Sequence, residues 1–114
     1  MKLPVVHIPF LPYDGMALFP FILIKRKVYR TNYILINHEK IHLRQQAELL
    51  LVFFYLFYIL NYIFNLFIYR NHQKAYLNIV FEKEAYAEEA KRDYLERRPL
   101  FEWLKYLWIN TKLK

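Results

Sequence analysis

The sequence predicts a mainly α-helical fold with a small N-terminal β element. Residues 1–30 contain four of the five prolines and a turn signal, so this part is expected to be extended, with a strand over Phe21–Tyr29. Residues 32–97 are expected to be helical, and residues 100–113 to form a short amphipathic tail rich in Trp and Lys. The length suits one hydrophobic core, so residues 1–114 are expected to form a single domain.

Composition excludes several kinds of site. The chain contains no cysteine, so disulfides, thiolate metal ligands and a cysteine nucleophile are excluded. The formal net charge of +7 is scattered rather than gathered in a nucleic-acid motif, and anionic lipid headgroups are its more natural counterpart. The N-terminal apolar stretch is broken by proline and is followed by the basic run Lys25-Arg26-Lys27, so no secretory signal is expected. We therefore expect a protein on the cytoplasmic side, associated with a membrane surface or bilayer and not with nucleic acid.

The run Asn37-His38-Glu39-Lys40-Ile41-His42 carries the candidate chemistry. It follows Asn32, a good N-cap residue, and is expected to be helical. Histidines at i and i+4 share one helix face, so both imidazoles can bind one metal ion. The intervening Glu39 then lies beside the metal, where it can take a proton from bound water. Without cysteine, nitrogen and oxygen must hold any zinc, and three such ligands plus a water are typical of a catalytic site.

A third ligand is expected on a second helix, predicted from Asn78 to about Arg97 and stopped by Pro99. This helix carries both Glu82 and Glu84. Their side chains point about 200° apart on a helix, so only one of them can face the metal. The residues alone leave both carboxylates open as the third ligand.

The run Leu49–Tyr69 is free of charged residues and long enough to span a bilayer. A straight crossing of about 30 Å would place His42 and Glu82 on opposite sides of the membrane, which is incompatible with one shared metal. The chain is therefore expected to double back, either through a turn near residue 62 or through a kink near Glu48 and a helix end at Arg70. A membrane-seated helix and a buried core helix both fit this pattern. One polar face recurs at helical spacing, and it consists of Tyr55, Tyr58, Tyr62, Asn65 and Tyr69.

These motifs resemble those of the gluzincin metallopeptidases, most closely the short minigluzincin type. That family has His-Glu-x-x-His on one helix and a glutamate ligand on a second helix, in a Glu-x-x-Ala-Asp context. His38, Glu39 and His42 match the first motif, and Glu82, with Ala85 three residues later, is similar to the second. The resemblance implies a minimal zincin-like domain, in which the His-Glu-x-x-His helix packs against the Glu-bearing helix and a long apolar helix.

The resemblance further implies a zinc metalloendopeptidase with His38, His42 and Glu82 as metal ligands. Glu39 would be the general base that activates a zinc-bound water for hydrolysis of a peptide bond. An N-terminal strand, expected to be Phe21–Tyr29, would line the cleft and pair with an extended peptide substrate.

The chain departs from the family where an aspartate usually orients a histidine ligand, because Tyr86 stands at that position. A phenol cannot supply the negative charge that raises the basicity of an imidazole. Tyr76, Tyr86 and Arg70 are the candidate donors to a developing oxyanion. The alternative function is a non-catalytic, membrane-associated or partner-binding helical module in which a metal only holds two helices together.

Overall fold

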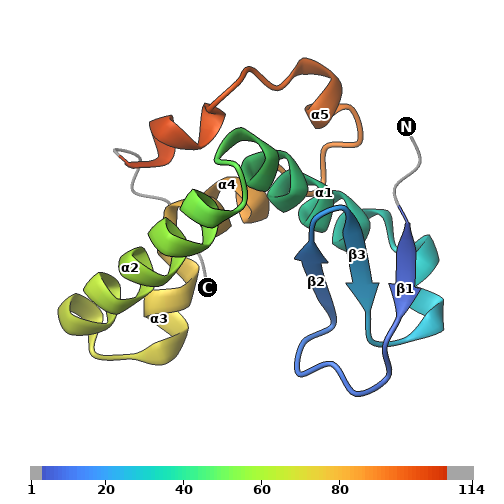
Figure 1. The fold of residues 1–114 in the computed structure, drawn as a ribbon, viewed down its shortest axis with the longest axis horizontal. Helices are drawn as coiled ribbons and strands as arrows, with labels where there is room; N and C mark the ends of the chain where they lie inside the picture. The colour runs from blue at the N-terminus through green and yellow to red at the C-terminus, as the bar shows by residue number, and fades with distance from the viewer. Residues whose placement is uncertain (1–3, 108–114) are drawn as a thin grey trace.

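The computed structural model describes residues 4–107 and shows a mainly helical chain with a three-stranded sheet on one side (Figure 1). The predicted class, mainly α with a small N-terminal β element, is therefore confirmed. Residues 108–113 of the predicted tail lie outside the described residues. In chain order the elements are β1 (Val5–His7), β2 (Gly15–Leu18), β3 (Phe21–Ile24), the 3-10 helix η1 (Lys27–Thr31), α1 (Tyr33–Glu48), α2 (Val52–Tyr69), α3 (His72–Leu77), α4 (Val80–Glu88), α5 (Tyr94–Arg97) and the 3-10 helix η2 (Glu102–Leu107).

The sheet has the strand order β1-β3-β2, with β3 parallel to β1 and antiparallel to β2. The β3 side chains of Ile22 and Ile24 are fully buried and pack with Leu43 of α1, which fixes the sheet against the helix. The predicted strand over Phe21–Tyr29 is wrong beyond Ile24, where the chain turns into η1. The basic run Lys25-Arg26-Lys27 follows at that point, and cations are seldom buried in a central strand.

Helix α1 begins where the sequence predicts it. The Oδ1 atom of Asn32 accepts a hydrogen bond from the backbone N–H of Leu35 at 3.2 Å and so caps the first turn. The helix ends at Glu48, and Leu50 and Leu51, two and three residues later, have positive φ angles of 55° and 61°. Such angles interrupt a right-handed helix, so the chain changes direction before α2.

The chain then doubles back after α2 rather than within it. Helix α2 is continuous to Tyr69 and ends at Arg70, whose backbone is left-handed with a φ of 53°. Asn71 caps the short helix α3, which the sequence did not predict, by accepting from the backbone N–H of Lys74 at 2.9 Å. Helix α3 leads back along α2 to α4 (Figure 1). The kink near Glu48 and the helix end at Arg70 are thus confirmed, and the turn near residue 62 is wrong.

The predicted second helix from Asn78 to Arg97 is in fact two helices, α4 and α5. The side-chain amide of Asn37 donates to the backbone carbonyls of Glu89 at 2.8 Å and Lys91 at 2.9 Å. Asn37 belongs to α1, so another helix supplies the donor for carbonyl groups at the end of α4. The chain can therefore leave the helical path there.

The inner face of α2 is bonded to the elements that follow it. Asn65 donates to the carbonyl of Ala75 in α3 at 3.1 Å, and Asn61 accepts from the backbone N–H of Val80 at 2.7 Å. The predicted polar face is confirmed for its three middle members, Tyr58, Tyr62 and Asn65. Its last member, Tyr69, is exposed. Only two residues of α2, Phe54 and Asn65, are buried, so the reading of α2 as a buried core helix is wrong.

Candidate metal centre

His38, His42 and Glu82 converge in the interior between α1 and α4, where their exposed fractions are 3–6%. The two Nε2 atoms lie 3.2 Å apart, and Oε1 of Glu82 lies 3.2 Å from Nε2 of His38 and 3.0 Å from Nε2 of His42. A tetrahedral zinc with bonds of about 2.0–2.1 Å holds its ligand atoms about 3.3–3.4 Å apart. The three side chains therefore form a triangle close in size to one face of a zinc tetrahedron.

The third corner of this triangle depends on the start of helix α4. Glu82 lies in the first turn of α4, whose first backbone N–H, that of Val80, donates to Asn61 of α2. The hydroxyl of Tyr58, also on α2, donates to Oε2 of Glu82 at 2.5 Å. Because Oε2 is held in this way, Oε1 is the oxygen that faces both imidazoles.

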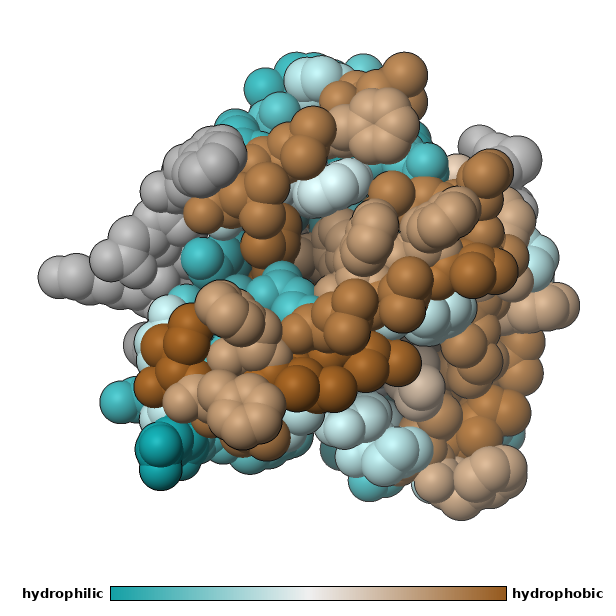
Figure 2. All heavy atoms as spheres, turned by 60° about the vertical axis from the view of Figure 1, so that its left-hand side comes forward, coloured by the Kyte–Doolittle hydropathy of each residue, from teal (hydrophilic) through white to brown (hydrophobic). Residues whose placement is uncertain are grey.

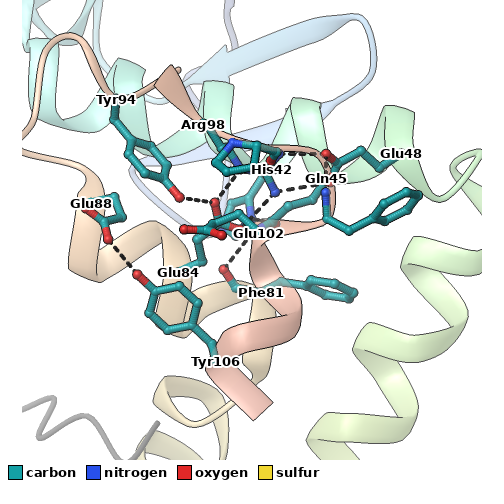
Figure 3. Close-up of polar contacts among 12 residues, drawn as sticks. His42, Gln45, Glu48, Phe81, Glu84, Glu88, Tyr94, Arg98, Glu102 and Tyr106 are labelled. Atoms are coloured by element: carbon teal, nitrogen blue, oxygen red, sulfur yellow. Dashed lines mark hydrogen bonds and ion pairs between the residues drawn. The ribbon is translucent and has the colours of Figure 1, made fainter. Parts of the chain in front are cut away.

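The outer ring nitrogens of both histidines are also held. Nδ1 of His38 lies 2.7 Å from Oε1 of Glu89, and Nδ1 of His42 lies 2.8 Å from Oε1 of Gln45. The Gln45 amide nitrogen donates to the carbonyl of Phe81 at 3.1 Å and to Glu84 at 2.9 Å, so its oxygen must be the acceptor for His42 (Figure 3). Both Nδ1 atoms therefore donate, and both Nε2 atoms can offer a lone pair to a metal.

The resulting electrostatics favour a cation at the centre of the triangle. Two lone-pair nitrogens and a carboxylate oxygen within about 3 Å repel one another unless protons or a metal ion lie between them. Burial alone would lower the pKa of His38, but hydrogen bonds to Glu82 and Glu89 outweigh it and raise that pKa to about 10. Burial likewise acts to raise the pKa of Glu82, yet His42 and His38 hold it well below its usual range. The cluster thus holds positive charge firmly, either as protons or as a metal ion.

Glu39 lies beside the ligands on the wall of a cleft of about 430 Å³. The cleft is also lined by His38, His42 and Glu82, and by the strand β2 at Gly15. Burial raises the pKa of Glu39, and the two nearby imidazoles oppose that rise. A Cβ atom at Gly15 would lie only 3.2 Å from Oε2 of Glu39, so glycine permits the close approach of β2 to this carboxylate.

Glu84, the rival third ligand, faces away from the triangle. It binds the guanidinium of Arg98 through both oxygens and accepts from the hydroxyl of Tyr94 at 2.6 Å (Figure 3). Arg98 also binds Glu48 of α1 at 2.7 and 3.1 Å, and all three charged side chains are 0–3% exposed. Glu84 is therefore part of a buried ion-pair network, and Glu82 alone joins the two histidines.

The carboxylate that orients His38 was missed from the sequence. Glu89 supplies it from the end of α4, seven residues after Glu82 and thus on the same face of that helix. Tyr86 instead packs its ring against His38, with centroids 4.6 Å apart, and shares a 3.2 Å hydroxyl contact with Tyr76. The charge missing at position 86 is therefore supplied one turn later.

Other predicted neighbours of the site divide into two groups. Tyr76 lines the cleft, whereas Arg70 lies at the far end of α2 and is not among the residues that line it. The strand that lines the cleft is β2, because β3 is the central strand and has β1 and β2 on its two sides. The expectation that the strand within Phe21–Tyr29 lies at the cleft is therefore wrong.

In comparisons with known proteins, no protein-family model, no curated protein and no solved structure matches this chain.

Proposed function

We propose that this chain is a zinc-dependent metallopeptidase of the gluzincin type, with His38, His42 and Glu82 as the zinc ligands. The observation that carries the proposal is the ligand triangle, whose sides of 3.0–3.2 Å fit one tetrahedral zinc. The absence of sulfur ligands and the presence of a carboxylate beside an open cleft favour a catalytic over a structural role.

Each residue then has a defined task. When bound, zinc would act as a Lewis acid that lowers the pKa of a water molecule and polarises the substrate carbonyl. Glu39 would take the proton from that water and deliver it to the leaving amine, and its burial raises its pKa, which favours the step in which it accepts the proton. Glu89 and Gln45 hold the two imidazoles in the tautomer that binds metal.

The outer edge of β2 is the natural place for an extended peptide. In this strand the carbonyl of Ala17 points away from β3 and accepts from Gln46 at 2.8 Å. Backbone groups two residues apart in a strand face the same side, so those of Gly15 also point outward, next to Glu39. A substrate strand that pairs with Gly15 would place its scissile bond near the ligand triangle.

Zinc analysis and a turnover assay on a matched pair of proteins test the proposal. Purified wild type and Glu39→Gln should each hold one zinc per chain, and only wild type should cleave a mixture of unstructured peptides followed by mass spectrometry. Loss of the general base should slow turnover by about 10²–10⁴-fold. Undiminished cleavage by Glu39→Gln would remove the assigned base.

A metal that only joins α1 to α4 is the second candidate, favoured by the deep burial of the ligands. In that case, zinc removal should unfold the protein, and neither wild type nor Glu39→Gln should cleave any peptide. Cleavage by wild type alone separates the two candidates.

A further inference from the structure

We propose that the outer face of α2 docks onto an anionic lipid bilayer, with the helix lying in the plane of the membrane surface rather than crossing it. The proposal concerns a surface that the metal centre does not use, and it does not depend on catalysis.

The outer face of α2 is a continuous apolar surface. Figure 2 shows apolar side chains gathered along this helix on the face turned toward the viewer. Among the described residues, α2 is the one helix long and apolar enough to cross a membrane by length and composition. Soluble monomers rarely expose apolar patches larger than a few hundred Å². Its exposed apolar side chains include Phe53 (49%), Leu60 (53%), Phe64 (64%), Phe67 (76%) and Ile68 (57%).

The opposite face of α2 is not free to meet lipid. Tyr58 donates to Glu82, Tyr62 contacts His72 at 2.8 Å, and Asn65 donates to the carbonyl of Ala75. A helix that crossed the bilayer would carry these partners into the hydrocarbon, including the exposed cation Lys74 of α3. Only one side of α2 can therefore enter the membrane, as in an amphipathic helix at the interface.

The charge distribution favours lipid over a second copy of the chain. The net charge is +7, and four of the ten acidic residues are buried, whereas Arg98 is the only buried lysine or arginine among residues 4–107. The surface is therefore more basic than the composition suggests, with Arg70 exposed directly at the end of α2. Two such chains would repel each other, while anionic headgroups would attract each of them.

Docking in this way places the cleft beside the bilayer. Tyr55 and Tyr58 of α2 line the cleft, and the two apolar residues between them, Leu56 and Phe57, are exposed. The wall of the cleft and the membrane-facing surface are thus two sides of one helix.

Single-cysteine labelling tests the proposal. Because the chain has no cysteine of its own, only the introduced cysteine is labelled. Phe53→Cys, Leu60→Cys and Phe67→Cys lie at seven-residue intervals on one exposed side of α2, and the outermost two are about 21 Å apart along the axis. Each variant carries an environment-sensitive fluorophore and is mixed with vesicles of phosphatidylcholine, with or without phosphatidylserine. Lipids with quenchers at a shallow or a deep position report the depth of each label. The matched control is Gln73→Cys, an exposed position on α3.

We expect all three α2 labels to be quenched at the same shallow depth, and the Gln73→Cys label to stay in water. Partition should be at least tenfold stronger with phosphatidylserine present, and it should weaken as salt is raised. A gradient of depth along the three labels would instead show a crossing helix and overturn the proposal. The proposal would also be overturned if the protein bound to neither kind of vesicle. The same holds if the fluorophore emission shifted to the blue without vesicles and the protein had the mass of a dimer.

Discussion

Removal of the Arg98 guanidinium should destabilise the fold strongly, because it leaves two buried carboxylates without a counter-ion. Arg98 binds Glu84 and Glu48, and the three side chains are 0–3% exposed. Loss of one partner from a buried ion pair costs about 3–5 kcal/mol. We therefore expect Arg98→Met to lower the free energy of unfolding by that amount. For 114 residues the entropy of unfolding is about 0.24 kcal/mol/K, so Tm should fall by about 12–20 °C.

The neighbouring arginine provides the control. Arg97 pairs with Asp93 on the surface, where the two side chains are 62% and 60% exposed. Such a pair contributes about 0–1 kcal/mol, so Arg97→Met should leave stability nearly unchanged. Urea unfolding of the three proteins, followed by far-UV circular dichroism, measures both effects. Equal midpoints for Arg98→Met and Arg97→Met would refute the assignment of a buried network.

Three further predictions concern the metal ligands, the cleft and the response to acid. Glu89→Gln should weaken zinc binding about 10-fold in a chelator competition, since the charge that supports His38 is lost; unchanged affinity would count against this role. Gly15→Ala should retain zinc but reduce kcat, because its Cβ would crowd Glu39 at 3.2 Å; full activity would show that this carboxylate can move freely. Burial acts to raise the pKa of Glu88, but bonds from a lysine and a tyrosine lower it overall, so its stabilising effect is present above about pH 4–5 and is lost as pH falls through the folded pKa. Unfolding titrations between pH 6 and about 3 should therefore show a shallower loss of stability in Glu88→Gln than in wild type.

The features that follow from local chemistry could be predicted from the sequence. Three features depend only on spacing or on residue type. They are the cap at Asn32, the shared helix face of His38 and His42, and the need for the chain to double back. The structure brings Glu82 to both histidines, as the resemblance to gluzincins implied.

The features that depend on distant contacts could not be predicted. Helix α4 ends where Asn37, more than fifty residues earlier, binds its last carbonyls. Glu89, at that end, bonds to His38, whereas Tyr86 contacts His38 only through its ring. The break between α1 and α2 was expected near Glu48 only as one of two alternatives, because no glycine or proline marks Leu50 and Leu51, where it falls. The edge position of β2 depends on which strand becomes central, and the spacing of apolar residues does not encode this order.

The most direct test of the proposed zinc enzyme is the metal content of protein purified without added zinc. Elemental analysis should find one zinc per chain in the wild type and none in a His38→Ala, Glu82→Ala double variant that is still folded by circular dichroism. A wild type without stoichiometric zinc, or a double variant that retains it, would contradict the assignment of these ligands.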